Sequence, residues 1–149
     1  MSPDAGISSS RHRTRHRARQ AAVQMLYQSE IGQHDIEEVV RSFWTANLPG
    51  AEGVPENVRS FAEQLVRSTA ANLAKIDPII AETAEHWRLS RMAALDRIIL
   101  RLAIGEFLSG DTPRNVVINE ALELAKTFSG DESVKFVNGI LDAVKKKLQ

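Results

Sequence analysis

The spacing of apolar residues constrains the fold of this chain more than any other feature. Through nearly the whole sequence, apolar side chains recur at intervals of three and four residues, and few β-branched residues alternate with polar ones. Such intervals return to one face of an α-helix, whereas a half-buried strand needs an interval of two. The sequence therefore predicts an all-α protein, with helices over residues 11–30, 35–47, 55–74, 77–87, 91–109, 113–128 and 132–148.

Prolines and glycines support these boundaries. Proline has no amide hydrogen and fits the first position of a helix, so Pro55, Pro78 and Pro113 are each expected to begin one. Asp77 and Thr112 directly precede two of them and can cap those helices. Glycines fall between the apolar patterns, where the chain must reverse: Gly32, Gly50, Gly53, Gly110 and Gly130.

Length and composition favour a single domain of about seven helices over residues 10–149. The chain has 149 residues, of which 43% are apolar, and can bury one sizeable core. Residues 1–9 are small, polar and without periodicity, so we expect a disordered tail there. The absence of cysteine excludes disulfides, thiolate zinc sites and cysteine nucleophiles, and it fits a reducing, cytoplasmic compartment. Apolar runs such as Ile98–Leu100 are far shorter than the roughly 20 residues of a membrane span, so no membrane segment is expected.

The segment from Met92 to Leu108 is the expected centre of the fold, because apolar residues cover most of its circumference and other helices must surround it. Glu106 falls in this apolar sector, so we expect it to be buried and paired, in a structural role more readily than a catalytic one. The last two helices each carry one apolar stripe: Ile118, Ala121, Leu122 and Ala125, then Val137, Ile140, Leu141, Val144 and Leu148.

Charge is divided unevenly along the chain. Residues 1–19 carry five arginines and one acid, for a net charge of +4, whereas residues 20–149 carry 14 basic and 18 acidic residues, for a net charge of −4. The five arginines occupy every second position: Arg11, Arg13, Arg15, Arg17 and Arg19. This segregation indicates that the N-terminal end binds a polyanion, most simply a nucleic acid. A transit peptide or nuclear signal can share this composition, but here the basic run leads directly into an amphipathic helix.

A helix through this region presents one continuous polar stripe. At 100° per residue, the side chains within about 40° of a common line are Arg13, Arg17, Gln20, Gln24 and Tyr27. The opposite side carries Ala18, Ala22, Met25, Leu26 and Ser29, and Arg15 and Arg19 fall toward it. Guanidinium, amide and phenol groups suit contacts to the phosphates, base edges and base faces of RNA, so we interpret the stripe as a nucleic-acid surface. The stripe alone does not select RNA over DNA, and a merely solvated face is the alternative.

Two other features of the sequence are weaker indications of a binding site. His12 and His16 have the spacing of two metal ligands, but the surrounding arginines disfavour a cation, so no metal site is expected. In the last helix, Lys135 and Phe136 lie on one flank of the core stripe, Asn138 on the other and Gly139 on the back. Close approach of another backbone or of a ligand would explain a glycine at that point, and Phe136 fits a ligand contact and a peripheral core position equally well.

Two segments together resemble one known family. Residues 15–28 read RHRARQAAVQMLYQ, and residues 111–144 read DTPRNVVINEALELAKTFSGDESVKFVNGILDAV. The chain from about residue 10 to its end is similar to the NusB family of bacterial transcription antitermination factors. The resemblance implies an all-helical domain of two packed helical groups. It also implies a non-catalytic protein that binds single-stranded boxA RNA of ribosomal RNA operon leaders together with NusE, a small-subunit ribosomal protein.

The resemblance further implies the partners and the residues that contact them. The complex acts with RNA polymerase and other Nus factors during elongation, and family members differ in self-association, which leaves a homodimer open. No catalytic residue and no cofactor is expected. Protein-partner contacts map to Tyr27 and Asp96. RNA contacts map to the arginine-rich helix and the start of the last helix: Arg11, Arg13, Arg15, Arg17, Arg19, Gln20, Gln24, Tyr27, Lys135 and Phe136.

Two other functions compete with this one. A similar helical domain precedes the catalytic domain of some RNA cytosine methyltransferases, but this sequence has no glycine-rich phosphate loop and no cysteine nucleophile. A helical module that binds only proteins would direct its arginines at an acidic partner. Salt dependence and competition with single-stranded RNA would separate that module from an RNA-binding adaptor.

Overall fold

The computed structural model describes residues 3–45, 53–84 and 89–148, and within them the side chains from Ser10 onward except that of Ser90. These residues form seven α-helices and one 3₁₀ turn, and no strand occurs among them. The elements are α1 (Pro3–Gly32), α2 (Ile36–Phe43), α3 (Glu56–Ala71), α4 (Leu73–Thr83), η1 (Leu89–Arg91), α5 (Ala94–Ser109), α6 (Arg114–Phe128) and α7 (Asp131–Lys147). The all-α prediction is confirmed. No helix among the described residues has the length and apolar character needed to cross a membrane.

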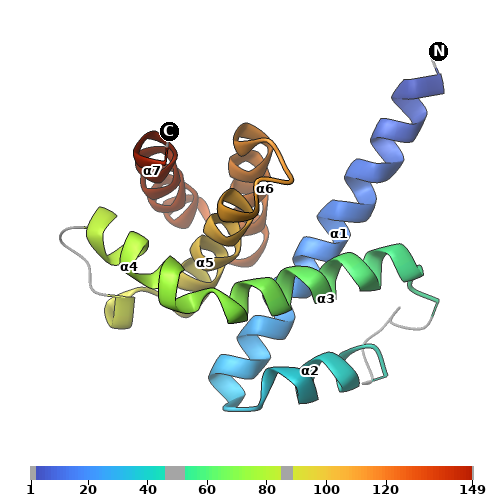
Figure 1. The fold of residues 1–149 in the computed structure, drawn as a ribbon, viewed down its shortest axis with the longest axis horizontal. Helices are drawn as coiled ribbons and strands as arrows, with labels where there is room; N and C mark the ends of the chain where they lie inside the picture. The colour runs from blue at the N-terminus through green and yellow to red at the C-terminus, as the bar shows by residue number, and fades with distance from the viewer. Residues whose placement is uncertain (1–2, 46–52, 85–88, 149) are drawn as a thin grey trace. The chain divides into compact units, whose positions relative to one another are not determined.

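The helices fall into two compact units, Met1–Arg67 and Ser68–Gln149. The first unit contains the long helix α1, which packs against α2, and most of α3 (Figure 1). Helix α1 begins at Pro3, whereas the sequence predicted a disordered tail over residues 1–9. Proline has no amide hydrogen and suits the first position of a helix, which fits a start at this point.

Helix α2 is short and held by local contacts. Asp35 caps its N-terminus by accepting a hydrogen bond from the amide of Glu37 at 3.2 Å. The predicted helix over 35–47 ends earlier, at Phe43, and Phe43 packs edge-on against Trp44 with ring centres 4.9 Å apart. Val39, Val40 and Phe43 form its buried face.

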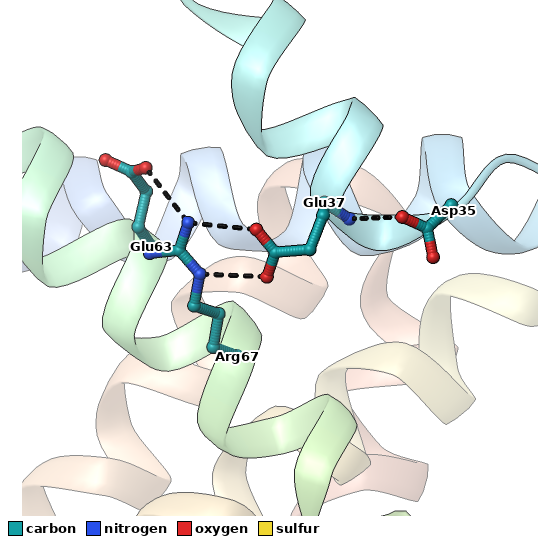
Figure 2. A network of polar contacts seen from close by, with 4 residues as sticks. All are labelled: Asp35, Glu37, Glu63 and Arg67. Carbon is teal, nitrogen blue, oxygen red and sulfur yellow. Dashed lines mark hydrogen bonds and ion pairs between the residues drawn. The ribbon is translucent and has the colours of Figure 1, made fainter.

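An ion-pair network joins α2 to α3 (Figure 2). The guanidinium of Arg67 donates to both carboxylate oxygens of Glu37, at 3.0 and 3.1 Å, and lies 3.8 Å from Glu63 on its own helix. The hydrogen bond from Arg67 lowers the pKa of Glu37 and raises the pKa of Arg67. Both side chains are half exposed, so the pair fixes the orientation of α3 more than it adds stability.

Helix α5 is the centre of the second unit, as its composition predicts. Figure 1 shows α4, α6 and α7 gathered around it, and α5 packs against all three. Glu106 is 6% exposed, which confirms its predicted burial, whereas Leu108 is exposed. The buried residues of α5 are Ile98, Ile99, Leu100, Leu102, Ala103, Ile104, Gly105, Glu106 and Phe107. A Cβ on Gly105 would lie 3.3 Å from Thr69 Oγ1, so this glycine permits close packing.

The N-terminus of α4 differs from the prediction. Pro78 was expected to begin a helix with Asp77 as its cap, but α4 begins at Leu73 after Asn72 and contains Pro78 in its interior. Asp77 instead accepts two hydrogen bonds from Arg101 of α5, at 2.8 and 3.0 Å. Proline inside the helix leaves one backbone hydrogen bond unformed. The bidentate pair joins α4 to α5.

Helices α6 and α7 each bury one apolar face in the second unit. Leu124 is buried and Leu122 is only half-buried, so the buried face of α6 is rotated from the predicted stripe, because α6 packs against both α5 and α7. Val137, Leu141 and Val144 of α7 are buried as predicted. Pro55 and Pro113 each lie one residue before their helix and accept its first backbone bonds through their carbonyls.

Candidate nucleic-acid interface

One face of α1 displays the predicted polar side chains to solvent. Arg13, Arg17 and Gln24 are exposed, Tyr27 is 39% exposed and Gln20 is half-buried. We call these five residues the α1 stripe. The stripe contains three kinds of group that bind RNA: guanidinium for phosphates, amides for base edges and a phenol ring for base faces.

The opposite face of α1 fixes this orientation. Ala18, Ala22, Val23 and Met25 are fully buried. A helix with one fully buried face cannot rotate about its axis without exposing those side chains to water. The exposure of the α1 stripe is therefore a consequence of packing.

Two of the five arginines lie outside the stripe and contact helix α3. The guanidinium carbons of Arg15 and Arg19 lie 4.6 and 5.4 Å from the ring centre of Phe61 on α3. Arg19 is only 2% exposed, so the expectation that it contacts RNA does not agree with its position. Its helical angle placed it near the apolar side, and an aromatic face on α3 provides an environment for the buried cation. Sequence periodicity did not identify Phe61 as this partner.

Two histidines flank the stripe near its N-terminal end. His12 is exposed and His16 is half-buried. Their rings lie nearly parallel, with centres 6.3 Å apart and planes inclined by 13°. No group of three histidine, cysteine or acidic residues suited to a metal ion occurs among the described residues.

The second unit brings two of the predicted site residues together. Asp96 in the first turn of α5 and Phe136 on α7 line one open pocket of about 220 Å³. The other lining residues are Arg91, Met92, Ala93, Glu132 and Ser133. Asp96 Oδ1 is buried and receives no hydrogen bond from the described residues, so it can accept one from a ligand. Lys135 is exposed on α7 beside this pocket and does not line it.

Gly139 lies on the exposed face of α7, and a Cβ at this position would meet nothing within 4 Å. Close approach of a backbone from the described residues therefore does not explain the glycine. The α1 stripe belongs to the first unit, and Asp96, Lys135 and Phe136 belong to the second.

Comparison with known proteins gives a consistent result. Residues 16–146 match the model of the NusB family. The chain is 45% identical over 136 residues to the transcription antitermination protein NusB of Koribacter versatilis, with 91% of this chain and 90% of that protein covered. It is 43% identical over 130 residues to NusB of Anaeromyxobacter dehalogenans, with coverage of 87% and 89%.

Solved structures extend the similarity to the fold. NusB of T. maritima is 36% identical, with a TM-score of 0.79 over 89% of this chain and 91% of the other. A second neighbour is 25% identical, with a TM-score of 0.75 over 91% of this chain and 98% of the other. It comes from a crystal structure of the antitermination factors NusB and NusE in complex with double-stranded RNA.

Proposed function

This chain belongs to the NusB family of transcription antitermination proteins, and we propose that it binds boxA RNA of ribosomal RNA operon leaders together with NusE. Membership of this family makes it a non-catalytic antitermination protein, not an RNA-modifying enzyme. The proposal concerns the RNA, the protein partner and the residues that bind each of them.

The observation that carries the RNA proposal is the α1 stripe. Arg13 and Arg17 are exposed on a face held outward by a buried opposite face, and the sequence has no acid between Asp4 and Glu30. Clustered arginines repel one another, and neutralising RNA phosphates relieves that repulsion. The RNA-binding set that we propose is Arg11, Arg13, Arg15, Arg17, Gln20, Gln24, Tyr27, Lys135 and Phe136. Arg15 contributes less to RNA binding than the exposed arginines, because its guanidinium lies over the ring of Phe61.

The proposed contacts to NusE are Tyr27 and Asp96. Tyr27 is a large exposed aromatic side chain at the end of the α1 stripe, and Asp96 has a buried carboxylate oxygen that lacks a donor among the described residues. A related structure contains NusE and double-stranded RNA with NusB, which supports assigning both partners to this chain.

The same proposal extends to the assembly and its location. We assign the protein to the cytoplasm, in a transcription elongation complex with RNA polymerase and other Nus factors. A homodimer is an alternative state of the free protein, and sedimentation in the absence of RNA would distinguish it from a monomer.

Fluorescence anisotropy of a labelled boxA RNA tests the function. The protein is titrated with and without NusE, against a scrambled RNA of equal length and against the double-stranded form. Tighter binding to single-stranded boxA, enhanced by NusE, is the expected result. Equal weak binding to all three RNAs, unchanged by NusE, would instead favour a module that binds only proteins.

A further inference from the structure

We propose that His12 and His16 form a stacking site for nucleobases of the bound RNA, beside the α1 stripe. This inference rests on the proposed RNA-binding function and adds two binding residues to it. Their spacing is also that of two metal ligands, but the surrounding arginines disfavour a cation, and the structure shows the two rings stacked.

The ring geometry is the first step of the argument. The two imidazoles lie nearly parallel, with planes inclined by 13° and centres 6.3 Å apart. Stacked aromatic pairs have ring centres roughly 4.5–7 Å apart, so the histidines already form a stacked pair along the helix. A pair of parallel rings is a suitable surface for planar bases, because every base has a π-face.

Placement on the helix is the second step. At 100° per residue, His16 lies about 40° from Gln20 and 60° from Arg13 around the helix axis. His12 is exposed and His16 is half-buried, whereas Arg13 and Arg17 are exposed. His12 lies about 40° further round the helix, about 100° from Arg13, and stacks on His16. An RNA strand whose phosphates contact the two arginines would therefore meet the ring of His16 first, with the ring of His12 next to it.

The local charge favours RNA over a cation. Arginine occupies every second position from residue 11 to residue 17, with both histidines between arginines, and no acid occurs between Asp4 and Glu30. No third metal ligand completes a site among the described residues. The positive charge of the arginines disfavours a metal ion at this position. A nucleobase is compatible with it, because stacking requires no negatively charged protein group.

Two double variants test the inference. His12→Ala with His16→Ala removes both rings, and His12→Phe with His16→Phe retains ring stacking without the ring nitrogens. Single-stranded boxA RNA carrying 2-aminopurine reports both affinity by titration and base stacking by fluorescence quenching. His34→Ala, which removes an exposed imidazole beyond α1, is the matched control.

We expect the alanine variant to weaken RNA binding about fivefold or more and to abolish part of the quenching, as loss of one stacked base would. The phenylalanine variant and His34→Ala should stay within about twofold of wild type. If the alanine variant does not fold, as judged by circular dichroism, His12→Ala alone gives the same readouts at an exposed position.

Other outcomes would overturn the inference, and they separate it from the proposed function. Wild-type affinity and quenching in the alanine variant would refute stacking, and so would equal losses in the alanine and phenylalanine variants. In either case, weaker binding by Arg13→Ala with Arg17→Ala would leave the proposed RNA function standing. Failure of the wild-type protein to bind RNA would refute both.

Discussion

The guanidinium of Arg15 lies 4.6 Å from the ring centre of Phe61, and the ring belongs to a different helix. The same ring lies 5.4 Å from the guanidinium of the buried Arg19. Phe61 thus supports the side of α1 that faces away from the α1 stripe. The contact joins α1 to α3, and Arg67 of α3 is in turn paired with Glu37 of α2 (Figure 2).

Replacing Phe61 tests this support. Phe61→Leu keeps an apolar side chain but removes the aromatic face, so we expect the free energy of unfolding to fall by about 0.5–2 kcal/mol in urea titrations. Phe61→Tyr keeps the face and should unfold like wild type. Equal stability of the leucine variant and wild type would show that the cation–π geometry contributes nothing.

These contacts mark the limit of what periodicity predicts. The helical angle correctly placed Arg13 and Arg17 outward and Ala18 and Ala22 inward, because helix geometry alone relates those positions. It placed Arg19 only near the apolar side. The burial of Arg19 depends on Phe61, which is remote in sequence and becomes a neighbour only through tertiary packing.

Other residues show the same limit. Pro78 has the local features of a helix start, but α4 begins at Leu73, and Asp77 pairs with Arg101 instead of capping a helix. Asp96 and Phe136 lie on helices predicted separately, and the pocket that joins them requires the packing of α5 against α7. Helix content was therefore predictable from sequence, whereas cross-helix contacts were not.

Substitution should separate the arginines of α1 into those needed for RNA binding and those needed for stability. Arg13→Ala with Arg17→Ala should weaken RNA binding without lowering the melting temperature, because both side chains are exposed. Arg19→Ala should lower the free energy of unfolding by about 1–3 kcal/mol, because its side chain is buried. Anisotropy and thermal melts on the three proteins measure both effects. Unfolding of the Arg13/Arg17 variant would contradict the orientation of α1.

The salt dependence of RNA affinity should report how many phosphates the protein contacts. Four of the proposed RNA-binding residues are exposed cations: Arg11, Arg13 and Arg17 in the first unit and Lys135 in the second. If each neutralises one phosphate of a single strand, log affinity should fall against log salt with a slope of about −2.8, and the Arg13/Arg17 variant should show about −1.4. A wild-type slope near zero would remove the electrostatic basis of the proposed function.

Replacing Asp96 should weaken binding of the protein partner more than binding of the RNA. Its Oδ1 lacks a donor among the described residues, so Asp96→Ala should reduce the enhancement of RNA binding by NusE while leaving binding without NusE close to wild type. Asp111→Ala, which removes an exposed acid from the same unit, is the control. Equal losses with and without NusE would count against Asp96 as a contact to this partner.

The pair between Glu37 and Arg67 should make part of the stability depend on pH. The hydrogen bond from Arg67 lowers the pKa of Glu37 below its ordinary value of 4.5 in the folded protein. The unfolded chain therefore binds more protons near that pH, so the contribution is fully present above pH 4.5 and is lost as pH falls through the lower folded pKa. Glu37→Gln should be less stable than wild type at pH 7, and this difference should vanish in acid. Urea titrations from pH 7 to pH 3 measure it, with Glu38→Gln as the control for loss of a carboxylate from the same helical turn. A constant difference across that range would mean that the charge of Glu37 contributes nothing, and that the hydrogen-bond geometry in Figure 2 alone accounts for the effect.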